Sequence, residues 1–281
     1  MKQLEITAII PTYNKSSYLD IVLFSIKEYI PELNILIIDD GSFDDTKRTV
    51  ENYKSYLNLD YLYKKNGGLS SARNIGVQYA DSKYILFLDD DRFFLENALK
   101  DISMKKNQIC IGVRKEVYFN NFEMLKRMIQ SETNNLKMRS VYERYYRKVK
   151  PLSNVEINMI PWVMCTFSNT ILSRDVVLEA HGFDECFKGW GFEDLELAYR
   201  IYKLIPNIEF KLDEKLINYH VFHSHKRMIL EQKERNYNLF YKKHSNYEVG
   251  LYEKFSSNKI DIVTYNDMIR SHIIKGVNHN A

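Results

Sequence analysis

Three consecutive carboxylates, Asp89, Asp90 and Asp91, directly follow a short apolar run at residues 84–88 of this 281-residue chain. In an extended chain the side chains of Asp89 and Asp91 point to the same side. Adjacent carboxylates repel one another unless a cation neutralises them, and oxygen ligands suit Mg²⁺ or Mn²⁺. The run therefore predicts a divalent-metal site. The alternative is a solvated turn from strand to helix, with Asp91 as a helix cap.

A second group of metal-binding side chain types lies near residue 220. His220, His223 and His225 place three of the seven histidines within six residues. A lone histidine is more often structural, but three together favour contact with a metal or a phosphate. If the segment is a strand, His223 and His225 share one face, whereas His220 and His223 do not.

Glycines, aromatic residues and carboxylates combine in the loop HGFDECFKGWGFED. Gly189 and Gly191 allow close backbone packing beside Trp190, whose indole offers a flat apolar face of the kind that stacks on a sugar ring. Glu193 and Asp194 then begin a predicted helix. We expect a carboxylate there to stay ionised at neutral pH, as a general base for a hydroxyl group requires. First-turn helix capping is the simpler interpretation.

The elements that position these side chains follow from the hydrophobic periodicity. Apolar runs rich in β-branched residues predict buried strands at 5–10 and 34–38, and further strands are expected at 61–63 and, buried, at 84–88, with helices between them. Ser42 with Asp45 resembles a capping box for the second helix, and Ser70 or Ser71 is expected to cap the third. The alternation predicts an α/β fold class with a mostly parallel central sheet.

Ligands of parallel sheets bind beyond the carboxyl ends of the strands. Three of the four predicted strands end there in polar clusters: PTYN, DDGS and the three aspartates. Asp39 and Asp40 also fit ordinary turn chemistry. Arg73 lies in the first turns of a predicted helix, where an anion such as a phosphate is favoured, although a surface ion pair is the common role of a single arginine.

The alternation fades after about residue 113, and residues 114–150 form a charged, tyrosine-rich stretch. A helix is expected at 194–202, and helical spacing continues from 226 onward. With no internal repeat and no linker, we expect one domain at 1–225, with a nucleotide-binding half (1–113) and an acceptor-binding half (114–225). Residues 226–281 are expected to form a helical extension packed on the core. Peripheral contact with an anionic membrane is the alternative.

Composition excludes several classes of protein. The chain is 45% hydrophobic and carries 40 basic against 37 acidic residues, which excludes a disordered chain and gives no sign of nucleic-acid binding. Residues 1–11 lack the uninterrupted apolar region of a secretory signal, so we do not expect export by that route, and no apolar run is long enough to cross a bilayer. Cys110, Cys165 and Cys186 form no CxxC pair, so we expect three reduced core cysteines in a cytoplasmic protein, either free or at the inner face of the membrane.

The polar blocks together resemble a known family. IIPTYN, IIDDGS, NGGLSSARNIG and FLDDD look like the successive motifs of family 2 glycosyltransferases, in order and spacing. GFDE with GWGFED resembles the acceptor-side motif of the galactosyl- and N-acetylgalactosaminyltransferase branch, which includes bacterial chondroitin-type polymerases. Five blocks in order are far more specific than any one of them. The resemblance implies the GT-A fold, a Rossmann-like domain that binds a nucleotide sugar.

The same resemblance implies an inverting, metal-dependent enzyme of bacterial glycan synthesis. It would move galactose, N-acetylgalactosamine, glucose or N-acetylglucosamine from a UDP-sugar to a hydroxyl of a saccharide, lipid-linked glycan or peptide. The residues implied at the nucleotide sugar are Pro11, Thr12, Tyr13, Asn14, Asp39, Asp40, Arg73, Asp89 and Asp90.

For the metal, Mn²⁺ or Mg²⁺, the resemblance implies Asp89 and Asp91, with Asp91 as the ligand. A pair that involves Asp90 stays open, because the middle residue of the motif is also an aspartate. A late histidine completes the site in related enzymes; His223 is the closest match, with His220 and His225 as rivals. On the acceptor side the implied residues are Asp194 as catalytic base, Glu193 beside it, and Trp190 and Gly191.

Two other functions fit parts of the pattern. A nucleotidyltransferase also uses a carboxylate-held metal, but the glycine-rich basic phosphate loop that such enzymes carry is missing between Ile10 and Lys27. A non-catalytic module that binds a nucleotide sugar would not need Glu193 and Asp194 beside Trp190.

Overall fold

The computed structural model describes residues 5–118, 121–131, 159–223 and 229–278. The N-terminal part alternates strands and helices as the periodicity predicts. Its elements are β1 (Ile6–Thr12), α1 (Ser16–Tyr29), β2 (Asn34–Asp39), α2 (Thr46–Glu51), β3 (Leu59–Tyr63), α3 (Leu69–Tyr79) and β4 (Tyr84–Leu88). The four strands are parallel in the order β3-β2-β1-β4.

The sheet continues with β5 (Arg92–Phe93), β6 (Gln108–Val117), β7 (Asn169–Ser173) and β8 (Glu209–Val221). The complete order is β3-β2-β1-β4-β7-β6-β8-β5. Strand β7 is antiparallel to both of its neighbours, and β5 is antiparallel to β8, whereas β6 and β8 are parallel. Four of the seven strand pairs in the described residues are therefore parallel, which agrees with the expected mostly parallel sheet.

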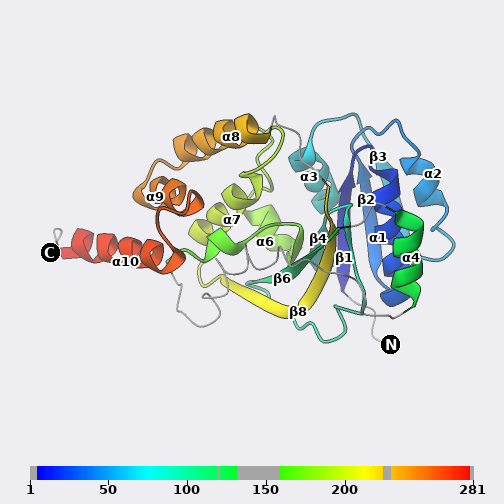
Figure 1. Cartoon of the computed structure of the whole chain (residues 1–281). Helices are drawn as coiled ribbons and strands as arrows, with labels where there is room; N and C mark the ends of the chain where they lie inside the picture. The colour runs from blue at the N-terminus through cyan, green and yellow to red at the C-terminus, as the bar shows by residue number, and fades with distance from the viewer. Residues whose placement is uncertain (1–4, 119–120, 132–158, 224–228, 279–281) are drawn as a thin grey trace.

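Helices cover both faces of the sheet (Figure 1). Along β2, Ile35 and Ile37 pack toward α1, while Leu36 and Ile38 pack toward α3, because successive strand residues point to opposite faces. Helix α4 (Phe122–Gln130) joins α1 on the first face, and α6 (Arg174–Glu179) and α7 (Glu193–Leu204) join α3 on the second. The short η2 helix (Pro161–Met164) contacts α7.

The C-terminal part is helical, as expected: α8 (Ile229–Lys243), α9 (Tyr247–Ser256) and α10 (Ile262–Asn278) lie on the α7 side of the molecule (Figure 1). Phe240, Leu251 and Tyr265 belong to the same buried cluster as Trp162 and Tyr199. The extension therefore packs on the core through an apolar face. Among the described helices, none combines the length and the apolar character needed to span a membrane.

Three local expectations are wrong. Helix α2 begins at Thr46 rather than after Ser42, whose hydroxyl instead accepts a hydrogen bond from the backbone N–H of Asn14 at 2.9 Å. Helix α3 follows Gly68 in a left-handed conformation (φ 95°), and neither predicted serine caps it. Cys186 is exposed rather than a core residue, whereas Cys110 and Cys165 are buried.

Candidate active site

The loops at the carboxyl ends of β1, β2 and β3 are tied together by two buried aspartates. Asp39 accepts hydrogen bonds from the backbone N–H of Ser42 at 2.7 Å and from the hydroxyl of Tyr61 at 2.6 Å. Asp40 accepts from the N–H groups of Gly67 and Gly68 at 2.9 and 2.7 Å and pairs with Lys64. These carboxylates shape the edge where the predicted nucleotide residues gather.

Asn14 connects two of these loops. It adopts a left-handed conformation (φ 51°), and its side-chain oxygen accepts a hydrogen bond from the N–H of Phe43 at 2.9 Å. The connection presents two aromatic rings to solvent: Tyr13 is 46% exposed and Phe43 85%. Their ring centroids lie 6.4 Å apart, edge to face. Phe43 was not predicted as a site residue, although an aromatic residue inside a turn of aspartates and serine was a visible signal.

Pro11 and Thr12 lie inside β1 and are buried. The hydroxyl of Thr12 is fully enclosed, and its contact with the Asp90 carboxylate lowers the pKa of Asp90, against the larger effect of burial. Thr12 lies at the end of β1, beside the N–H of Asp40, which donates to the carbonyl of Thr12 at 2.9 Å.

The three aspartates form the turn between β4 and β5, and the turn separates Asp89 from Asp91. Asp89 points toward two arginines: Arg73 Nη2 lies 3.0 Å from its Oδ1, and Arg92 Nε lies 3.4 Å from its Oδ2. The expectation that Asp89 and Asp91 share a side is wrong, because the extended chain ends at Leu88. Burial raises the pKa of Asp90 to about 6, against the opposing charge of Lys15.

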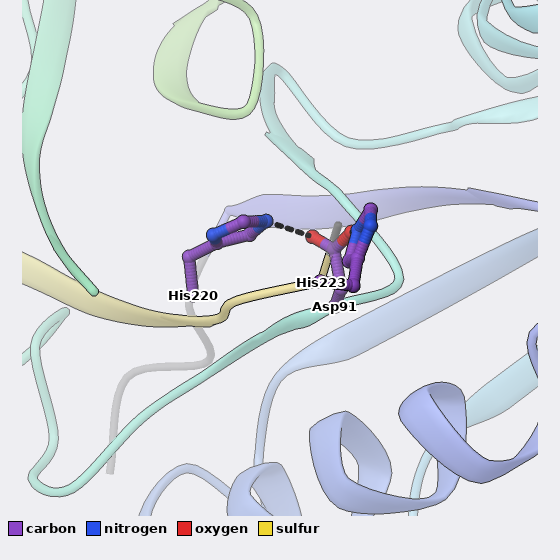
Figure 2. Close-up of side chains that lie close together, drawn as sticks. All are labelled: Asp91, His220 and His223. Atoms are coloured by element: carbon purple, nitrogen blue, oxygen red, sulfur yellow. Dashed lines mark hydrogen bonds and ion pairs between the residues drawn. The ribbon is translucent and has the colours of Figure 1, made fainter. Parts of the chain in front are cut away.

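Asp91 meets two histidines (Figure 2). His223 Nε2 lies 3.0 Å from Asp91 Oδ2, and His220 Nε2 lies 3.6 Å from Asp91 Oδ1. The expectation that His220 and His223 point apart is wrong, because β8 ends at Val221 and the chain then turns toward Asp91. His225, the third candidate, lies outside the described residues.

The group Asp91, His220 and His223 has the composition of a transition-metal site. One ligand atom from each residue lies within 4.8 Å of the others. His220 Nδ1 is buried without a hydrogen-bond partner, and Asp91 Oδ1 has the 3.6 Å contact with His220 Nε2. Burial opposes ionisation of Asp91, but contacts with the two histidines and Lys15 outweigh it and hold its pKa well below the usual range. One carboxylate and two imidazoles fit Mn²⁺ better than Mg²⁺, which prefers oxygen ligands alone.

Arg73 occupies the centre of the site rather than the surface. Its side chain is buried, and Nη1 donates a hydrogen bond to Asp194 Oδ1 at 2.7 Å, while Nη2 contacts Asp89. Glu193 Oε1 lies 3.9 Å from Nη1, and the guanidinium stacks over Phe183 at 5.1 Å from the ring centroid. One guanidinium thus links the turn after β4 to the start of α7.

The two carboxyl groups at the start of α7 are buried, and this changes their protonation. Burial raises the pKa of Glu193 to about 8, helped by repulsion from Asp194. Burial also raises the pKa of Asp194, although Arg73 opposes the shift. The sequence predicts ionised carboxylates here, whereas burial shifts the pKa of Glu193 toward the protonated form. The helix dipole and Arg73 do not offset the loss of solvent around it.

The loop before α7 is held by α8. Gly189 and Gly191 have φ angles of 75° and 96°, which side chains other than glycine rarely adopt. The N–H of Trp190 donates to Gln232 Oε1 at 3.0 Å, and Asn236 Nδ2 donates to the carbonyl of Gly191 at 2.8 Å. The indole of Trp190 is 47% exposed. Neither Gln232 nor Asn236 was predicted, although their spacing of four residues on one helix face was an available signal.

Comparison with known proteins identifies this arrangement. The model of the family described as glycosyl transferase family 2 matches residues 7–177. The chain belongs to glycosyl transferase family 2. A second model, described as the N-terminal domain of galactosyltransferase, matches residues 159–225, which include the Trp190 loop and Asp194.

The family 2 chain resembles a chondroitin synthase from Escherichia coli, with 24% identity over 220 residues. The match covers 70% of this chain but only 32% of the relative, so the chain spans about a third of that protein's length.

Solved structures agree on the fold. The Staphylococcus aureus TarS 1–349 structure in complex with UDP-GlcNAc has a TM-score of 0.57 at 17% identity and covers 84% of this chain and 65% of TarS 1–349. A mannosyltransferase from Pyrobaculum calidifontis in complex with GDP-Man and Mn²⁺ has a TM-score of 0.57 at 14% identity, covering 85% of this chain and 64% of the other. The fold is GT-A.

Proposed function

We propose that this family 2 member transfers a sugar from a UDP-sugar to an acceptor hydroxyl with inversion at the anomeric carbon. The observation that carries the proposal is the 2.7 Å contact between Arg73 and Asp194. Arg73 also contacts Asp89, in the turn between β4 and β5. Through Arg73, a carboxylate at the start of α7 therefore lies close to the turn that carries the metal-binding candidate Asp91.

Asp194 is the proposed general base. It accepts the proton of the acceptor hydroxyl while that oxygen attacks the anomeric carbon. The bond between this carbon and the diphosphate oxygen breaks, and UDP leaves with the bonding electron pair. The raised pKa of Asp194 suits this role, because a base works best when its pKa lies near the working pH. Protonated Glu193, beside it, is able to donate a hydrogen bond to the acceptor sugar.

The nucleotide is proposed to lie at the ends of β1, β2 and β4. The exposed ring of Tyr13 offers a surface on which a base can stack, and Thr12 lies beside it at the end of β1. Asp39 and Asp40 hold the loops around them. UDP as the nucleotide is supported by the UDP-GlcNAc in the TarS structure.

Asp91, His220 and His223 are the residues proposed to hold Mn²⁺. When bound, the ion neutralises negative charge that develops on the leaving diphosphate. Asp89 is not proposed as a metal ligand. It contacts Arg73 and Arg92 instead, so its proposed role is to hold these two arginines.

The acceptor is proposed to lie over Trp190 and Gly191, with a saccharide as the favoured class. The preference for a saccharide is supported by the relative described as a chondroitin synthase. Lipid-linked glycans and peptides are the alternative acceptors. We assign residues 1–113 to the nucleotide and 114–225 to the acceptor. The extension 226–281 supports the acceptor loop through Gln232 and Asn236.

The direct test is a panel of UDP-sugars, incubated with the protein in Mn²⁺ or in a chelator, with release of UDP measured. We expect slow hydrolysis of one or two donors that needs the metal. Asp91→Asn in the same assay controls for contaminating hydrolases. Absence of UDP release from every donor, with donor binding retained, would favour a non-catalytic binding module instead.

A further inference from the structure

A cation that belongs to the chain already contacts the carboxylates of the metal-binding group. Lys15 Nζ lies 2.7 Å from Asp91 Oδ2 and 3.2 Å from Asp90 Oδ1. Both aspartates are buried, whereas the lysine side chain is 32% exposed. The ammonium therefore reaches the carboxylates from the solvent side.

The backbone of Lys15 is fixed while its side chain is long and flexible. Its carbonyl accepts hydrogen bonds from the N–H groups of Tyr18 and Leu19 at 3.0 and 2.9 Å, which begin α1. The preceding residue, Asn14, is held to the loop after β2. The four-carbon stem runs past Tyr18, with Nζ 5.7 Å from the ring centroid. The ammonium can leave the carboxylates without any change in the backbone.

The ammonium and a divalent ion compete for the same oxygen. Asp91 Oδ2 is in contact with both Lys15 Nζ and His223 Nε2, at 2.7 and 3.0 Å. An ion ligated by Asp91 and the two histidines would lie within a few ångströms of the ammonium in this position. Like charges at such a distance repel strongly in a partly buried site. Coordination by Asp91 thus requires the ammonium to move away.

We propose that Lys15 is the internal counter-ion of the metal site, which pairs with Asp90 and Asp91 when no metal is bound and is displaced by the divalent ion. The inference rests on the metal assignment in the proposed function. It assigns a role to Lys15 that is distinct from ligation: the lysine keeps the metal-free site stable and lowers its affinity for the metal. Two buried carboxylates without a counter-ion would otherwise repel each other.

The test measures Mn²⁺ binding to the full chain by calorimetry without any nucleotide. Lys15→Gln removes the positive charge, and Lys15→Arg retains it. Lys54→Gln is the matched control, because it removes a lysine from the exposed ion pair with Glu51. We expect Lys15→Gln to bind Mn²⁺ about tenfold more tightly or better, because a repulsive charge is lost. Affinity in the other two variants should stay within about threefold of the unmodified protein.

Thermal unfolding provides a second readout that does not depend on activity. In a chelator, Lys15→Gln should unfold at a lower temperature than the unmodified protein. Mn²⁺ should raise the Tm of the variant by more than it raises the Tm of the unmodified protein. Unchanged or weaker Mn²⁺ affinity in folded Lys15→Gln would overturn the inference, as would equal Tm values in the chelator. Failure of the proposed function is a separate result, namely that the unmodified protein releases no UDP from any donor.

Discussion

Arg73 donates a hydrogen bond to Asp194 at 2.7 Å although 121 residues separate them in the sequence. The same guanidinium contacts Asp89 and lies 3.9 Å from Glu193. Three carboxyl groups therefore surround the buried guanidinium of Arg73, and Asp89 also contacts Arg92. Burial raises the pKa values of both Glu193 and Asp194, and repulsion from the neighbouring carboxylates adds to the shift. Arg73 is thus a positioning residue for the proposed base.

Replacement of Arg73 by alanine should destabilise the protein strongly. The change leaves buried carboxyl groups without their cation, so we expect the free energy of unfolding to fall by about 3–5 kcal/mol. Lys54→Ala, which breaks the exposed pair with Glu51, should cost less than about 1 kcal/mol. Urea unfolding of both variants measures the difference. Equal effects of the two substitutions would mean that Arg73 is not the counter-charge of the site.

Glu193→Gln should change how stability depends on pH. The pKa of Glu193 is about 8 in the folded chain, against an ordinary value of 4.5. The folded protein therefore holds a proton that the unfolded chain loses, and this contribution to stability declines as pH rises from 4.5 to about 8. Glutamine cannot ionise, so the variant should gain stability relative to the unmodified protein over that range. Tm measured from about pH 5 to about pH 9 checks this; parallel curves would contradict it.

The N-terminal half of the fold could be predicted because its signals are local. Five apolar residues between a polar turn and the three aspartates predict a strand at 84–88. In the structure β4 has these bounds, Tyr84–Leu88. Strands β6 and β8 were not predicted. The first half of β8 is rich in charged residues, and it becomes a strand through pairing with β6, which lies far away in the sequence. Such pairing leaves no local periodicity.

The candidate site was predicted in composition but not in its contacts. The motifs pointed to Asp91 and His223, yet strand alternation wrongly separated His220 from His223, because the point where β8 ends depends on its pairing partner. Arg73 was predicted to contact a phosphate. Its position between Asp89 and Asp194 could not be predicted from the sequence. The raised pKa of Glu193 could not be predicted either, because burial causes it and burial depends on how the folded chain packs.

The two outer aspartates of the turn should differ in their effect on metal binding. Asp91→Asn removes the ionised ligand between the two histidines, so Mn²⁺ binding should become undetectable by calorimetry. Asp89→Asn alters only the pairing with Arg73 and Arg92, and Mn²⁺ affinity should stay within about tenfold. Loss of Mn²⁺ binding in Asp89→Asn alone would instead make Asp89 the ligand.

Asn236→Ala should affect the acceptor more than the donor. Its amide holds the carbonyl of Gly191, so its removal should let the Trp190 loop shift. We expect kcat/KM for the acceptor to fall about tenfold or more, with metal-dependent donor hydrolysis nearly unchanged. Asn238→Ala, at an exposed position of the same helix, is the matched control. An equal loss in donor hydrolysis would show that α8 supports the whole site rather than the acceptor loop.

The most direct test of the account is the effect of Asp194→Asn on sugar transfer, once a donor and an acceptor are known. Asparagine can still accept the hydrogen bond from Arg73 but cannot take a proton. We predict turnover reduced by about 10²-fold or more, with affinities for the UDP-sugar and Mn²⁺ within about threefold of the unmodified protein. Turnover close to that of the unmodified protein would contradict the account and remove Asp194 from the role of general base.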